Sequence, residues 1–187
     1  MVPLTSAATS SEPMKVRHPR LRLDKPSAWF AATFITRGVL RADMAFTRDG
    51  VIHASPERVF SVISDLDQTR QWMPAIERID VVTPGPFRQG TVWRETRNAG
   101  KRTLESTIRV TGFEKPSRLD LEVESRPMKG QISFRLTPRE ESTAVHYEAQ
   151  MQGRGLMRLM SGMMNRMMAE ADNDIIDRLK HHVEERA

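Results

Sequence analysis

The chain has 187 residues, no cysteine and a net charge of +5, a length that suits one domain with or without a tail. The lack of cysteine excludes disulfides, thiolate zinc sites and a cysteine nucleophile, and it fits a reducing compartment such as the cytoplasm. No segment approaches the roughly 20 consecutive apolar residues that a transmembrane helix needs.

The positive charge is concentrated at the N-terminus. Residues 1–43 hold seven basic and three acidic side chains, whereas residues 44–187 hold 22 and 21. A nucleic-acid-binding domain typically gathers basic residues on one face, often with stacking aromatic side chains. The body of the chain has neither, so we expect no nucleic-acid partner.

Residues 1–43 differ from the rest in composition, being rich in Ser, Thr, Ala, Pro and Arg without a sustained period. Such a composition predicts a disordered extension. Two alternatives remain: an organelle transit peptide, or a start-site error with translation beginning at Met44. The predicted domain covers residues 44–187.

Regular patterns begin at Met44, where residues 44–54 read as a strand. Ser55 and Pro56 then have the preferences of a helix N-cap and first helical position, with Glu57 in the first turn. This predicts a helix over residues 56–66. A second short helical stretch follows and ends at Pro74, because the residue before a proline disfavours the α conformation.

Six further strands are predicted from alternating apolar and polar residues between turns. The alternation is strictest in RLDLEVES, where Leu119, Leu121 and Val123 share one face. One apolar and one polar face are typical of an antiparallel sheet that is covered on one side. The expected strands are residues 76–83, 91–98, 101–113, 118–125, 131–138 and 142–151.

The last predicted element is a long helix from about Gly155 to Glu185. A curved antiparallel sheet leaves one apolar face open, and this helix is the element left to cover it. The predicted fold class is therefore α+β: about seven antiparallel strands wrapped around a C-terminal helix, with two short helices after the first strand.

The start of this helix is rich in methionine. Residues 156–170 contain six of the twelve methionines of the chain, and at about 100° per residue they fall within a sector of roughly 140°. Asn165, Arg166 and Asp172 lie outside that sector, so we expect the methionines to face the sheet. They either pack as ordinary core or line a pocket, for which their flexible side chains are suited.

The order of elements and three sequence motifs resemble the START-like superfamily (SRPBCC), in particular its polyketide cyclase/dehydrase and lipid transport group. The motifs are VIHASPERVFSVISDLDQTRQWMPAIERIDVV, GTVWRETRNAGKRTLESTIRV and STAVHYEAQMQG. The resemblance covers roughly residues 45–187. It implies a helix-grip fold with a cavity between the sheet and the C-terminal helix that holds a hydrophobic small molecule.

Seven residues are the candidates for contact with such a ligand. Trp72 is either at the cavity mouth or a packing anchor, and Trp93 is either exposed to solvent or part of a polar patch in the cavity with Glu95 and Arg97. Tyr147 either orients a ligand through its hydroxyl or is a satisfied core tyrosine. The seven candidates are Trp72, Trp93, Phe134, Tyr147, Met160, Met164 and Met167.

Residues for chemistry are few. His53, Glu95, Arg109 and Tyr147 are the candidates for a reacting cavity, and no spacing typical of a metal, a phosphate loop or a Ser-His-Asp triad is present. No metal or cofactor is therefore expected, and the sequence does not indicate the oligomeric state.

Three functions remain open at this stage. The first is binding or carriage of a lipid, isoprenoid or polyketide-like molecule. The second is an enzyme of the polyketide cyclase or aromatase type, for which positioning of a flexible chain supplies much of the catalysis. The third is a protein-interaction module with a collapsed cavity.

Overall fold

The computed structural model describes residues 45–98, 103–153 and 161–185. The predicted disorder of residues 1–43 lies outside them. Within the described residues, no helix is both long and apolar enough to cross a membrane.

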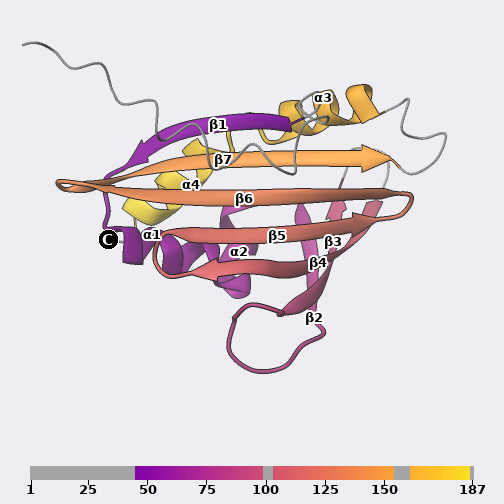
Figure 1. Cartoon of the computed structure of the whole chain (residues 1–187), viewed down its shortest axis with the longest axis horizontal. Coiled ribbons are helices and arrows are strands. Elements are labelled where there is room, and N and C mark those ends of the chain that lie inside the picture. Colours follow the sequence, from indigo (N-terminus) through magenta and orange to yellow (C-terminus); the bar gives the residue numbers. More distant parts are fainter. Residues whose placement is uncertain (1–44, 99–102, 154–160, 186–187) are drawn as a thin grey trace, which may run out of the picture. The chain divides into compact units, whose positions relative to one another are not determined.

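Seven strands form one antiparallel sheet in the order β1-β7-β6-β5-β4-β3-β2 (Figure 1). β1 pairs with β7, the last strand of the chain, and every other pair of neighbouring strands is consecutive in sequence. Every strand lies within a few residues of its predicted position. The strands are β1 (Ala45–Ile52), β2 (Ile76–Val81), β3 (Val92–Asn98), β4 (Thr103–Glu114), β5 (Arg118–Ser125), β6 (Met128–Arg139) and β7 (Ser142–Gly153).

Two short helices connect β1 to β2. α1 (Pro56–Ile63) begins as predicted, because the hydroxyl of Ser55 accepts a hydrogen bond from the backbone N–H of Arg58 at 3.2 Å. α2 (Leu66–Trp72) begins at Asp65, whose carboxylate accepts from the backbone N–H groups of Asp67 and Gln68. Both caps satisfy N–H groups that have no partner within the helix.

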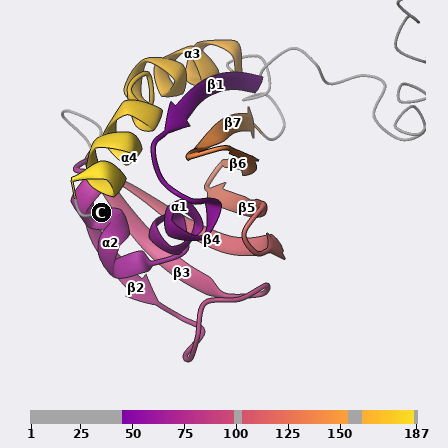
Figure 2. The same ribbon diagram turned by 90° about the vertical axis from the view of Figure 1, so that its left-hand side faces the viewer.

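The C-terminal helical segment is divided by a turn at residues 172–174 into α3 (Ser161–Ala171) and α4 (Ile175–Glu184). Gly50 of β1 permits close packing of α4, since a Cβ atom at this position would collide with the Cγ2 atom of Ile176. Figure 2 shows the sheet curving around the side on which α1, α2 and α4 lie.

The core fills the space between this concave side and the helices. Strand residues of alternating burial, such as Leu119, Phe134 and Val145, pack with Val59 of α1 and Leu179 of α4 in one continuous cluster. The α+β helix-grip fold predicted from the sequence is thus confirmed.

Candidate functional site

An enclosed cavity of about 340 Å³ lies between the concave face of the sheet, α2 and the C-terminal helices. Most of its wall is apolar. Its apolar lining comes from every strand except β1 and β2 and includes Trp72, Trp93, Leu121, Phe134 and Met168. Enclosed, mostly apolar volumes with a few polar groups are typical of small-molecule sites.

Three of the predicted ligand contacts line this cavity. Trp72 at the end of α2 and Trp93 of β3 are each 4% exposed, and Phe134 of β6 is 5% exposed. Trp93 lines the cavity together with Glu95 and Arg97, so the polar-patch alternative for this face of β3 holds and the solvent alternative does not.

Tyr147 lies behind the cavity wall. Its ring packs on Phe134 and Phe46, with ring centroids 5.0 and 5.8 Å away, and its hydroxyl donates a hydrogen bond to Asp172 Oδ2 at 3.1 Å. Asp172 itself lines the cavity, so Tyr147 contacts the cavity wall through that carboxylate.

The predicted orientation of the methionine-rich helix is wrong for Met163 and Met167 and correct for Met168. Met163 and Met167 are both 54% exposed, while Asn165 and Asp172, expected outside, are buried. Met168 does line the cavity. Met160 and the side chain of Met164 lie outside the described residues, and the further methionines of the cavity wall are Met73, Met128 and Met151.

α3 turns Asn165 toward the sheet because backbone polar groups at the end of β7 need hydrogen-bond partners there. Met151 lies one residue beyond the last described pair of β1 and β7, Ala45 and Gln150. Asn165 accepts from the backbone N–H of Met151 at 2.9 Å and donates to its carbonyl at 3.0 Å. Buried backbone groups require such partners, and a methionine at position 165 provides none.

A charged cluster occupies one wall of the cavity. The Nε of Arg97 donates to a carboxylate oxygen of Glu95, and its Nη1 lies 3.9 Å from Asp172 Oδ1. Arg178 of α4 approaches the same carboxylate at 4.0 Å. The cluster consists of Glu95, Arg97, Asp172 and Arg178, with Tyr147 attached through its hydroxyl.

The electrostatics of the cluster fix two protonation states. Burial acts to lower the pKa of Arg97, but the neighbouring carboxylates of Glu95 and Asp172 outweigh it, so its pKa is raised and the guanidinium stays charged. Burial, followed by the charge of Asp172, raises the pKa of Tyr147 well above its usual value. The phenol is therefore a neutral hydrogen-bond donor.

Two other predicted participants in chemistry lie away from the cavity. His53 is exposed, and its backbone N–H donates to Glu184. Arg109 is exposed on the outer face of the sheet, as its alternation with Ile108 and Val110 indicates, so Glu95 pairs with Arg97 instead. Among the residues described, no group of three or more His, Asp and Glu side chains is placed to hold a metal ion.

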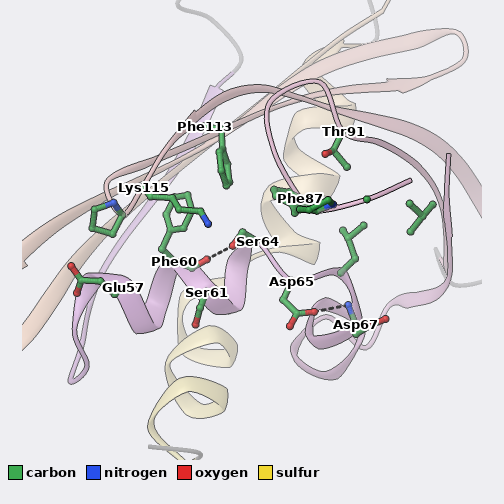
Figure 3. A pocket seen from close by; sticks show the side chains of 15 residues that line it. Glu57, Phe60, Ser61, Ser64, Asp65, Asp67, Phe87, Thr91, Phe113 and Lys115 are labelled. Carbon is green, nitrogen blue, oxygen red and sulfur yellow. Dashed lines mark hydrogen bonds between the residues drawn. The ribbon is translucent and has the colours of Figure 1, made fainter. Parts of the chain in front are cut away.

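A second hollow is a larger and more open groove of about 610 Å³ beside α1 and the connection from β2 to β3 (Figure 3). Phe113 packs against Phe60 and Phe87 in it, with centroid distances of 5.3 and 5.7 Å. Glu57, Asp65 and Asp67 also line the groove. Its open form and acidic lining favour the enclosed cavity as the site for an apolar ligand.

A curved sheet that encloses an apolar cavity against a C-terminal helical segment defines a helix-grip ligand-binding domain. The sequence from residue 43 to residue 184 matches the family described as polyketide cyclase / dehydrase and lipid transport, and the chain belongs to that family. No curated protein matches the chain.

Several solved structures share the fold at low sequence identity. A START superfamily protein from Mycobacterium smegmatis has a TM-score of 0.66 and 15% identity, covering 77% of this chain and 99% of its own. A protein from Thermus thermophilus has a TM-score of 0.64 and 17% identity, with coverages of 76% and 99%. The Zhui aromatase/cyclase from a Streptomyces species has a TM-score of 0.61 and 13% identity, with coverages of 76% and 94%.

Proposed function

We propose that the domain binds and carries a hydrophobic small molecule, such as a lipid, isoprenoid or polyketide-like compound, in the cavity between sheet and helices. The observation that carries the proposal is the enclosed volume of about 340 Å³ with its largely apolar wall. Membership of a family that includes lipid transport supports it, and the lack of cysteine suits a cytoplasmic carrier.

Native mass spectrometry of protein purified without detergent tests the proposal. A bound molecule that is lost on denaturation, or uptake of an added fatty acid, quinone or aromatic polyketide, is the expected result. Protein that is empty and takes up none of the three contradicts it.

A matched pair of variants locates the ligand. Ser106 on β4 lines the cavity, and its neighbour Thr107 is exposed on the other face of the sheet. Ser106→Phe fills the cavity and should abolish uptake, whereas Thr107→Phe should leave uptake unchanged. Equal uptake by both variants places the ligand elsewhere, with the groove beside α1 as the next candidate.

An enzyme of the cyclase or aromatase type is the second candidate, favoured by the charged cluster at the cavity wall. The Arg97 cation can stabilise negative charge that develops on a ligand oxygen in a transition state, and the neutral phenol of Tyr147 holds the Asp172 carboxylate beside it. Tyr147→Phe then slows turnover of a poly-β-ketone substrate while leaving its binding nearly unchanged. A collapsed interaction module has no comparable support, since the cavity keeps a volume of about 340 Å³.

A further inference from the structure

The open groove beside α1 leaves apolar side chains in contact with solvent. The rings of Phe60, Phe87 and Phe113 line it (Figure 3). Phe87 and Phe113 are only partly buried, and Val81, which lines the groove at the end of β2, is 56% exposed. Apolar side chains that gather in an exposed groove are typical of an interaction site.

Carboxylates line the same groove on the side of the two short helices. They belong to Glu57 of α1 and to Asp65 and Asp67 at the start of α2 (Figure 3). Burial acts to raise the pKa of Asp65, but its hydrogen bonds with Gln68 and Asp67 outweigh this and lower the pKa, so the group is ionised. Glu57 and Asp67 are exposed, and their carboxylates have no hydrogen-bond or ion-pair partner among the described residues.

One cation of the chain already lies over this aromatic surface. The Nζ of Lys115 is 5.3 Å from the ring centroid of Phe113, within the range of a cation–π interaction. Lys115 forms no ion pair with the described residues, although it lines the groove together with the carboxylates. Three carboxylates and one ammonium give the lining a net charge of −2.

The form and the charge of the groove decide between possible occupants. A small molecule is usually buried over most of its surface, which an open groove does not provide, whereas a protein segment lying along it needs only one covered side. Nucleic acids and anionic membranes carry negative charge that the carboxylates repel. A protein segment that combines apolar side chains with Lys or Arg complements both the exposed apolar surface and the free carboxylates.

We propose that the groove is a docking site for a basic, apolar segment of a partner protein. Apolar side chains of the segment cover the exposed valine and phenylalanine groups, and its Lys or Arg side chains pair with Glu57 and Asp67. One of these cations displaces Lys115 from the aromatic ring. The site is separate from the enclosed cavity, with which it shares only Leu66 among the lining residues, so the inference does not rest on the proposed function.

Three labelled peptides test the proposal by fluorescence anisotropy: GKKLFKKLFKKG, the same peptide with Glu in place of Lys, and the same peptide with Ser in place of Leu and Phe. The first should bind at least about 10-fold more tightly than either of the others, because only it matches both charge and apolar surface. Its affinity should fall as the salt concentration rises, since the paired charges are exposed.

Two neighbouring valines provide a matched pair of variants. Val81 lines the groove, whereas Val82 is also exposed, at 50%, but does not line it. Val81→Lys places a like charge in the path of the segment and should weaken binding of the basic peptide about 10-fold. Val82→Lys adds the same charge beside the groove and should change the affinity less than about 2-fold, the effect of an added charge that is screened.

The carboxylates have a matched control as well. Glu57→Gln/Asp67→Asn should weaken binding of the basic peptide about 5-fold, through the loss of two exposed charge pairs. Glu105→Gln/Glu148→Gln removes the same charge from exposed positions on the outer face of the sheet and should leave binding unchanged. Circular dichroism verifies that each variant is folded.

Lys115→Gln distinguishes a cationic occupant from an acidic one. Removal of the competing ammonium should tighten binding of the basic peptide about 3-fold, since the ring of Phe113 is then free to take a cation of the peptide. An acidic occupant would instead bind more weakly, because it loses its one positive partner in the groove. Weaker binding of the basic peptide to this variant contradicts the displacement of Lys115.

The outcomes on the unaltered protein decide the proposal without any variant. Equal binding of the Lys and Glu peptides, or binding of neither, overturns it and leaves hydrophobic-ligand binding in the cavity untouched. Equal losses in Val81→Lys and Val82→Lys place the peptide on another surface and overturn the groove as the site. Ser106→Phe, which fills the enclosed cavity, should bind the basic peptide normally, and a loss there would mean that the peptide enters the cavity instead.

Discussion

Arg97 holds together a part of the cavity wall that its neighbours alone would destabilise. Glu95 and Asp172 are 5% and 4% exposed, and both face this guanidinium. Carboxylates taken out of water are tolerated when a cation and hydrogen bonds compensate for the lost hydration. The arginine is therefore structural as well as available to a ligand.

Replacement of Arg97 should show this dependence directly. Arg97→Met leaves Glu95 without its partner and is expected to lower the free energy of unfolding by about 3 kcal/mol, the effect of breaking a buried ion pair. The double variant Glu95→Gln/Arg97→Met removes both charges and should recover most of that loss. Urea denaturation at neutral pH measures both, and equal losses in the two variants would exclude a buried unpaired charge as the cause.

Tyr147 can be followed alone, because it is the only tyrosine of the chain. Burial raises the pKa of its phenol well above 10.0 in the folded protein, whereas in the unfolded chain it titrates at about 10. Below pH 10 the phenol is protonated in both the folded and the unfolded chain, and its contribution to the free energy of unfolding is fully present. Above it the unfolded chain loses the proton first, so the free energy of unfolding falls as the pH rises.

Two measurements check this behaviour. In concentrated urea, phenolate absorbance near 295 nm should appear at about pH 10. In buffer without urea it should appear only at the higher pH at which the protein unfolds. Tyr147→Phe should lose about 1–2 kcal/mol at neutral pH, since its hydrogen bond to Asp172 is gone, and its stability should fall less steeply above pH 10. A tyrosine that titrates near pH 10 while the protein stays folded would falsify the buried, hydrogen-bonded phenol.

At the scale of elements, α3 is held on the sheet by a small number of polar contacts. Asn165 pairs with both backbone groups of Met151, as a strand neighbour would. Arg48 of β1 donates to the carbonyl of Ala169 at 2.9 Å and to Asn173 at 3.3 Å, near the end of the helix. Among the described side chains of this helix, Met168 is partly buried and packs against the hydrophobic core.

Asn165→Ala should therefore loosen α3 while the rest of the fold persists. Two buried hydrogen bonds are lost, and we expect a cost of about 2 kcal/mol with faster amide hydrogen exchange at Met151 and through α3. Arg166→Ala is the control, because Arg166 is exposed and its ion pair with Glu170 is of the kind that contributes little. Unchanged exchange in Asn165→Ala would mean that other contacts hold the helix.

The elements that local pattern determines were predictable from the sequence. The alternation of Leu119, Leu121 and Val123 identified β5, and the Ser55 cap fixed the start of α1. These signals depend on residues a few positions apart. Phe134 was likewise predicted from its place in such a strand, whereas Trp72 was placed through the family resemblance and the face of Trp93 was left open; all three line the cavity.

The charged cluster and the orientation of α3 were not predictable in this way. Arg97, Asp172 and Arg178 come from β3, the turn after α3 and α4, and only the folded chain brings them together. The apolar periodicity of α3 favoured its methionines as the buried face. The buried side is instead occupied by Asn165, which pairs with the backbone of Met151, and by Asp172, which accepts from the hydroxyl of Tyr147. The alternation of Trp93, Glu95 and Arg97 was the one available signal of a polar wall.

On the scale of the whole domain, the cavity opposes stability. A volume of about 340 Å³ between the sheet and the helices forgoes the packing contacts that a filled core would make. The buried charges of its wall add a desolvation cost. A ligand that fills the space restores contacts to the folded state only, and binding and stability are therefore linked.

This linkage gives a prediction for thermal unfolding. A fatty acid, quinone or aromatic polyketide that the domain takes up should, at about 100 times its Kd, add about 2.7 kcal/mol to the free energy of unfolding, which corresponds to a rise in Tm of about 5–10 °C for a domain of this size. Ser106→Phe should lose this response, because its ring occupies the ligand's volume, while Thr107→Phe should retain it. A ligand-induced rise of the same size in Ser106→Phe would show that the probe stabilises the domain from a site outside the cavity.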